Sequence, residues 1–205
     1  MNIDYFNEYL NYKNIGLKPK VKELIIKFIN SFNNYEEKEL WVTEYLSKLE
    51  LDSNGRLRNE LFEEIVFPVL LNGYNNKNIF QMVWLTKLSQ NLYQNNKIWQ
   101  KIDNKTDLEI IKECYEIDPN NNEVIEIYLE LEIRGIDFSI HEWPHGILFG
   151  NNFATKDECK MILDEISFLY KLDKNKKYFE YIKEYENKVK EYMETKNNEE
   201  RRHCT

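Results

Sequence analysis

Apolar residues recur every three or four positions along most of this chain, which is the spacing of one face of a helix. The clearest example follows Pro19, which stands where the first turn of a helix tolerates a proline. Its apolar face consists of Val21, Leu24, Ile25, Phe28, Ile29 and Phe32. Segments 57–71, 79–93 and 107–117 have the same period, and Pro68 is expected to kink or divide the first of them. The pattern therefore predicts a series of amphipathic helices.

Segment 123–134 fits two periods. Apolar and polar residues alternate from Ile125 to Arg134, which is typical of a half-buried strand. Four of its apolar residues also share one helix face: Val124, Ile127, Tyr128 and Leu131. The turn at Asp118-Pro119 and Gly135, placed as the C′ residue of a helix, favour the helix, with the strand as the alternative.

Segment 136–153 breaks the helical pattern. It contains Gly146, Gly150, Pro144 and two of the three histidines, so we expect a long ordered loop with a short strand around 147–149. Thr155 and Glu158 have the spacing of a capping box, which predicts a helix up to about residue 172. A last helix is expected after the polar turn at 173–176.

These segments together predict a mostly all-α fold, a bundle or stack of about eight or nine antiparallel helices with one short β element near 136–150. We expect a single helical domain over 1–195, with a candidate sub-boundary near 52–56, where Asp52-Ser53-Asn54-Gly55 reads as a turn. Residues 196–205 are expected to form a flexible polar tail.

The composition of the 205 residues supports this picture. Apolar residues make up 42 %, enough for a core, whereas 6 Gly and 4 Pro are few for an all-β fold with many tight turns. The net charge of −8 and the absence of a long basic run disfavour binding of nucleic acid, which needs a basic face. The same charge suits a basic protein partner.

The cysteines and the apolar segments bear on the location of the protein. Cys114, Cys159 and Cys204 are widely spaced and form no Cys-x-x-Cys pair, so we expect a reducing, cytoplasmic environment. The start of the chain lacks the basic-then-apolar order of a signal peptide. The longest apolar segment, 65–71, is too short to span a membrane, so no membrane association is expected.

The turn Asp118-Pro119-Asn120-Asn121 resembles the turn between tetratricopeptide repeats, and Ile111 and Cys114 stand at positions that the repeat tolerates. The resemblance covers about one helix pair and implies stacked helical hairpins.

His141-Glu142-Trp143-Pro144-His145 satisfies the pattern H-E-x-x-H and resembles the zincin peptidases. In that family, a helix presents two histidines to zinc and the glutamate activates the bound water. The resemblance implies that His141 and His145 ligate zinc, that Glu142 is catalytic, and that Glu165, twenty residues downstream, is the third ligand.

Pro144 argues against this assignment. It has no N–H to donate to the carbonyl of Ile140, and it disfavours a helical conformation of Trp143, so a helix through both histidines is not expected. A thiol nucleophile is also disfavoured, because Asp157 and Glu158 next to Cys159 should raise its pKa.

Two surfaces remain as candidates for binding. Glu123, Glu126 and Glu130 form one stripe if 123–134 is helical. The irregular segment adds Trp143, Phe149, His141 and His145, and aromatic residues in loops are frequent interface anchors. We therefore predict a non-catalytic helical protein that binds a basic protein partner without a cofactor, such as an inhibitor, an immunity protein or an adaptor. The alternative is a zinc-dependent hydrolase that uses 141–145. The oligomeric state is left open.

Overall fold

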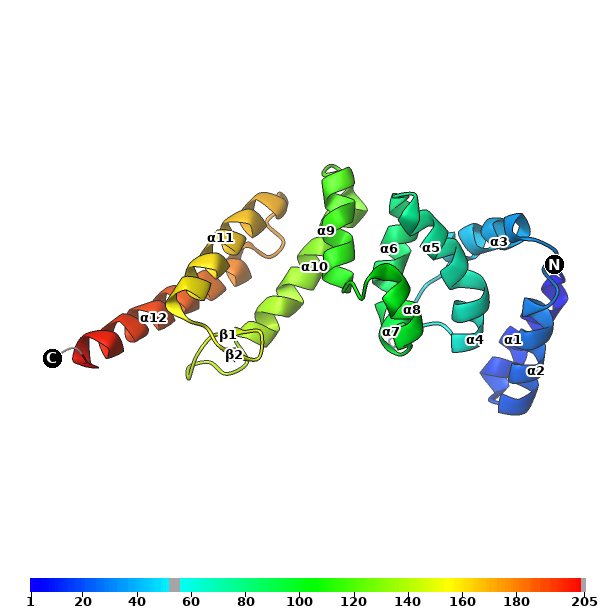
Figure 1. Ribbon diagram of the computed structural model, residues 1–205, viewed down its shortest axis with the longest axis horizontal. Helices are drawn as coiled ribbons and strands as arrows, with labels where there is room; N and C mark the ends of the chain where they lie inside the picture. Colours follow the sequence, from blue (N-terminus) through cyan, green and yellow to red (C-terminus); the bar gives the residue numbers. More distant parts are fainter. Residues whose placement is uncertain (52–55, 204–205) are drawn as a thin grey trace. The chain divides into compact units, whose positions relative to one another are not determined.

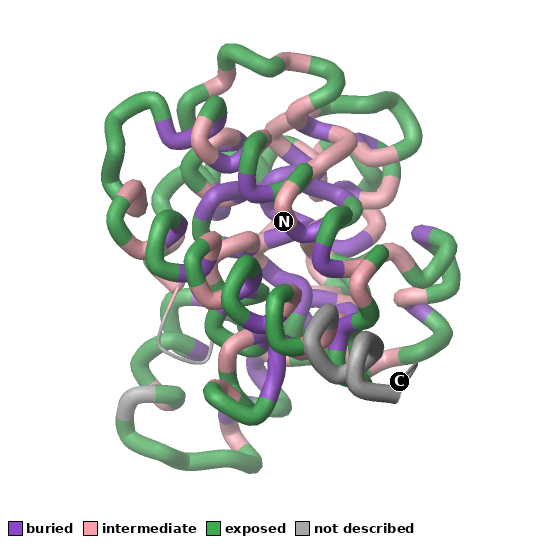
Figure 2. Tube along the Cα trace, turned by 90° about the vertical axis from the view of Figure 1, so that its left-hand side faces the viewer, coloured by how far each residue is buried: buried purple, intermediate pink, exposed green. Residues whose placement is uncertain are grey.

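The predicted mostly all-α fold is confirmed in the computed structural model, which describes residues 1–51 and 56–203 (Figure 1). Contacts between Cα atoms divide the chain into two compact units, residues 1–119 and 120–205. The expected turn at 52–55 lies outside the described residues. Buried positions recur along the helices of each unit (Figure 2), which is the three-to-four residue pattern of the sequence.

The regular elements among the described residues of the first unit are all helical. Its α-helices are α1 (Ile3–Ile15), α2 (Lys18–Ile29), α3 (Tyr35–Ser47), α4 (Asn59–Leu61), α5 (Phe67–Asn75), α6 (Ile79–Lys87), α7 (Ser89–Tyr93), α8 (Asn96–Trp99) and α9 (Asp107–Ile117). A π-helical turn, η1 (Phe62–Val66), lies between α4 and α5, and a 3₁₀ turn, η2 (Gln100–Ile102), follows α8. Helix α1 packs on α2, and α6 packs on α5 and α9.

Aromatic rings fill the core between α1, α2 and α3. Phe6, Phe28 and Trp41 are buried, and the centroids of these three rings lie 4.9–5.1 Å apart. Gly16 allows α1 to turn back into α2, because it ends α1 at a φ of 81°, which a residue with a Cβ adopts only at a cost.

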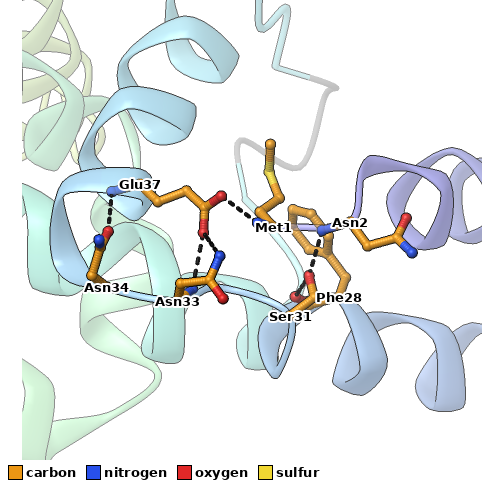
Figure 3. A network of polar contacts seen from close by, with 7 residues as sticks. All are labelled: Met1, Asn2, Phe28, Ser31, Asn33, Asn34 and Glu37. Carbon is orange, nitrogen blue, oxygen red and sulfur yellow. Dashed lines mark hydrogen bonds and ion pairs between the residues drawn. The ribbon is translucent and has the colours of Figure 1, made fainter.

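A network of polar contacts ties the start of α1 to the segment between α2 and α3 (Figure 3). The amide of Asn2 donates to Ser31 Oγ at 2.9 Å, and that hydroxyl donates to the carbonyl of Phe28 at 2.7 Å. The carboxylate of Glu37 accepts from the amino group of Met1 and from the amide of Asn33. These contacts, above all the one with the amino group, lower the pKa of Glu37.

The expected division of the helical segment near Pro68 is present, because the structure splits it into α4, the π-helical turn η1 and α5. The backbone stays helical throughout, and η1 ends two residues before the proline. Because Pro68 has no N–H, the carbonyl of Glu64 lacks its usual helical donor. Lys38 Nζ, from α3, donates to that carbonyl instead, at 3.3 Å.

Up to residue 203, the second unit consists of three long helices and a β-hairpin. They are α10 (Asn122–Ser139), β1 (Leu148–Phe149), β2 (Asn152–Phe153), α11 (Lys156–Leu172) and α12 (Phe179–His203). The strands are antiparallel, with Leu148 opposite Phe153. Helices α11 and α12 bury facing stripes at helical spacing, which are Cys159, Ile162, Ile166, Leu169 and Leu172 on α11, and Ile182, Tyr185, Val189 and Tyr192 on α12.

Several predictions for this unit can be compared directly with the structure. Segment 123–134 is helical, and the strand alternative is wrong. Gly135 does not end the helix, which continues to Ser139. The capping box of Thr155 and Glu158 is present, and α11 ends at Leu172 as expected. Helix α12 extends to His203, past residue 195, where we expected the helical domain to end.

Candidate functional site

The H-E-x-x-H segment is a series of turns and not a helix. The amide of Trp143 donates to the carbonyl of Ile140 at 3.0 Å, and the amide of His145 to the carbonyl of Glu142 at 2.8 Å. The peptide bond before Pro144 is cis. His141, Glu142 and His145 are exposed, and Trp143 is half-buried. The two histidines therefore do not lie one turn apart on a helix face, as the zincin arrangement requires.

The third residue of the hypothetical zinc site lies on another element. Glu165 is an exposed residue of α11. Among the side chains that the structure describes, no three of His, Cys, Asp or Glu are grouped so that they could hold a metal ion. The described chain therefore lacks the zincin arrangement of two histidines on one helix turn.

A cavity of about 170 Å³ lies within the second unit, between α10, the hairpin, α11 and α12. It contains two residues that the sequence had singled out, Phe149 and Glu165. The remaining lining residues are Glu132, Gly135, Ile136, Phe138, Ser139, Leu148, Gly150, Ile162, Ile166, Leu169 and Tyr185. Most side chains of the whole lining are apolar, and two, Glu132 and Glu165, are carboxylates.

Ser139 and Tyr185 form a buried polar contact at this cavity. Ser139 Oγ donates to the carbonyl of Leu148 at 2.7 Å, so its single proton is used, and Tyr185 must donate across the 2.8 Å hydroxyl–hydroxyl contact. Burial raises the pKa of Tyr185 to about 12, and the nearby carboxylates of Glu165 and Glu132 act in the same direction. Tyr185 is therefore a protonated hydrogen-bond donor at neutral pH.

Large apolar side chains are exposed beside the cavity. Phe138 lines it and is 54 % exposed, and Met161 is 53 % exposed on α11, one turn before Glu165. Phe153, 48 % exposed, lies opposite Leu148 in the hairpin. Phe153 also packs over Gly146, where a Cβ would lie 2.4 Å from its ring. Exposed apolar groups next to a cavity are typical of a surface that another molecule covers.

The predicted acidic stripe is present on α10, but part of its charge is already balanced. Lys177 Nζ lies 3.3 Å from Glu126 and 3.5 Å from Glu130. Glu123, in the first turn of α10, also has an interaction partner within the protein. The carboxylate of α10 that reaches the cavity is Glu132, which the sequence analysis did not select. Helical spacing alone could have indicated Glu132, because it is four residues before Ile136 and seven before Ser139 and so lies on the same helix face.

The two cysteines whose side chains are described are buried. Cys114 lies in α9 of the first unit and Cys159 in α11 of the second. Burial raises the pKa of Cys114 to about 12 and raises that of Cys159, with Glu158 adding to the effect at the latter. Neither thiol has the depressed pKa that a nucleophile needs.

Comparison with known proteins does not assign this chain to a family. The chain matches no known protein family, and no curated protein or solved structure is significantly similar to it. None of the helices in the described part of the chain is long and apolar enough to cross a membrane. The function must therefore be argued from the site alone.

Proposed function

We propose that this chain is a non-catalytic helical interaction protein that binds a basic segment of a protein partner at the cavity of its second unit. The observation that supports this most directly is the lining of the cavity, where apolar side chains lie next to the carboxylates of Glu132 and Glu165. Each of these carboxylates also has an interaction within the protein, so the incoming cation would add to contacts that already exist. A lysine or arginine side chain has the matching chemistry, because an apolar stem carries a cation at its end.

The size of the cavity suits one long side chain. Cavities of about 150 Å³ in proteins accept a molecule as large as benzene, and this one has about 170 Å³. The exposed Phe138, Phe153 and Met161 would add apolar contacts around the inserted side chain, since interfaces place aromatic residues and Met in their desolvated centres.

The activities that fit this chemistry are those of an inhibitor, an immunity protein or an adaptor. In each of them, a rigid surface recognises one partner and no bond is made or broken. The buried, widely spaced cysteines suit a reducing cytoplasm, and the net charge of −8 favours encounter with a basic partner.

Selection from a displayed library of random peptides tests this proposal without knowledge of the partner. The selected peptides should contain Lys or Arg next to an apolar residue. Their affinity, measured by fluorescence anisotropy, should fall on the order of fivefold in Glu165→Gln and on the order of tenfold in Phe138→Ser, as expected for one charged contact and one apolar anchor.

Glu8→Gln is the matched control, because Glu8 is an exposed carboxylate on α1 of the first unit. It removes the same charge and should leave the affinity unchanged. Selected peptides without Lys or Arg, or an equal loss of affinity in Glu165→Gln and Glu8→Gln, would contradict the proposal.

A further inference from the structure

A second, open hollow of about 570 Å³ lies at the turn that joins α11 to α12. It shares no residue with the cavity described above. Four of its eight lining residues are lysines, which is unusual in a chain with 36 acidic and 28 basic residues. The lining consists of Tyr170, Lys171, Asp173, Lys174, Lys176, Phe179, Lys183 and Glu186.

The four lysines of this hollow form no ion pair with a carboxylate among the described residues. Elsewhere on the same two helices, lysines do pair, since Lys160 lies 2.7 Å from Asp157 and Lys188 lies 2.7 Å from Glu184. Four ammonium groups around one hollow repel one another, and a bound anion would relieve that repulsion.

Both acidic residues that line the hollow are already occupied by donors of the chain itself. The carboxylate of Asp173 accepts from the amides of Lys177 and Tyr178 at 2.9 and 2.8 Å. Glu186 accepts from the hydroxyl of Tyr170 at 2.8 Å and pairs with Lys190. These contacts occupy the two carboxylates, and Lys183 also attracts Glu186. Four lysines against two carboxylates still give the hollow an excess of positive charge.

The backbone of the turn is fixed, so the lysines start from defined positions. Asp173 is buried, and its two amide contacts close the turn in front of α12. The amide of Lys176 donates to the carbonyl of Asp173 at 3.0 Å, and Lys176 has a φ of 56°. A ligand that binds the lysines therefore needs to order only their side chains.

Aromatic rings form the apolar part of the same hollow. The rings of Tyr170 and Phe179 lie 5.4 Å apart with an interplanar angle of 49°. Lys176 Nζ lies 5.8 Å from the centre of the Phe179 ring. Ammonium groups beside an aromatic face match a ligand that has both anionic groups and a flat ring.

We propose that this hollow is a binding site for a nucleoside polyphosphate, whose phosphates contact the four lysines and whose base contacts Phe179 and Tyr170. A single nucleotide fits this surface better than a nucleic acid. A polymer needs a basic stripe that follows its backbone, whereas the positive side chains here surround one hollow of a chain with a net charge of −8.

Isothermal titration of the full-length protein with ATP, inorganic tripolyphosphate and adenosine tests the site at low ionic strength. We expect saturable binding of ATP, weaker binding of tripolyphosphate and no binding of adenosine. The triple variant Lys171→Gln/Lys174→Gln/Lys176→Gln should bind ATP on the order of tenfold more weakly, because each exposed charged contact contributes up to about a factor of five.

Two further variants separate the phosphate contacts from the ring contacts. Phe179→Leu should weaken ATP but leave tripolyphosphate unchanged. Lys156→Gln is the matched control, since Lys156 begins α11 and lies about 22 Å along the helix from Lys171, and it should bind ATP like the unmodified protein. Circular dichroism verifies that each variant is folded.

Three results of these titrations would overturn the proposal. These are no saturable binding of ATP, an equal loss in the triple variant and in Lys156→Gln, or equal affinities for ATP and tripolyphosphate that Phe179→Leu does not change. The last result would identify a site for inorganic polyphosphate alone. Binding of a single-stranded oligonucleotide in preference to ATP would also contradict it.

Discussion

Ser139 shows how one side chain can connect three elements of the second unit. It is the last residue of α10, and its hydroxyl contacts the carbonyl of Leu148 in β1 and the hydroxyl of Tyr185 in α12. Because the contact between Ser139 and Tyr185 is buried, removal of the serine hydroxyl leaves the Tyr185 hydroxyl without this partner, and the half-buried carbonyl of Leu148 loses its donor as well.

We predict that Ser139→Ala lowers the free energy of unfolding by about 1–3 kcal/mol, the cost of leaving buried polar groups unpaired. Urea unfolding followed by circular dichroism measures this change. Ser167→Ala is the control, because Ser167 is exposed on α11 and its hydroxyl contacts only the carbonyl of Leu163 in the same helix. An equal effect of both changes would show that the contact with Tyr185 has no special role.

At the scale of elements, the length of α10 is decided by a competition at Gly135 and Ile136. A glycine within a helix costs about 1 kcal/mol relative to alanine. Ile136 is only 4 % exposed, and burial of an isoleucine contributes about 1.5–3 kcal/mol. The stabilisation from burying Ile136 exceeds the cost of the glycine, so the helix continues through Gly135 instead of ending there.

Gly135→Ala should therefore raise the free energy of unfolding by about 0.5–1 kcal/mol, because an added Cβ meets no atom within 4 Å and alanine favours the helix. Thermal unfolding provides the measurement. Gly16→Ala should do the opposite by about 1 kcal/mol, because Gly16 has a φ of 81°. Destabilisation by Gly135→Ala would mean that Gly135 ends the helix.

The sequence was sufficient for the features that depend on near neighbours. The capping box at Thr155 and Glu158, the apolar stripe of α12 and the break at Pro144 each follow from residues a few positions apart. The cavity could not be predicted in the same way, because Glu132, Ser139, Phe149, Glu165 and Tyr185 come together only when α10, the hairpin, α11 and α12 pack. The response of the helix to Pro68 likewise depends on Lys38, which comes from a different helix.

At the scale of the whole molecule, buried tyrosines make stability depend on alkaline pH. Burial raises the pKa of Tyr45 in the first unit and of Tyr185 in the second to about 12, from 10.0. In the unfolded chain, both would lose their protons near pH 10. Between pH 10 and pH 12 the unfolded state binds fewer protons than the folded state, so the free energy of unfolding falls as the pH rises.

We predict that the free energy of unfolding decreases as the pH rises from about 10 to 12, with Tyr185 contributing roughly 2 kcal/mol. Urea unfolding at a series of pH values measures the slope. Tyr185→Phe should make the slope shallower, since phenylalanine has no proton to lose. An unchanged slope would show that Tyr185 ionises as readily in the folded protein as in the unfolded chain.

The buried thiols allow the opening of each unit to be timed separately. Cys114 reports on the first unit and Cys159 on the second, and each reacts with an alkylating reagent only after its surroundings have opened. In a Cys204→Ser background, pulse alkylation and mass spectrometry would time the two openings separately. Equal labelling rates would identify a chain that opens as one body, and unequal rates a chain whose halves unfold independently.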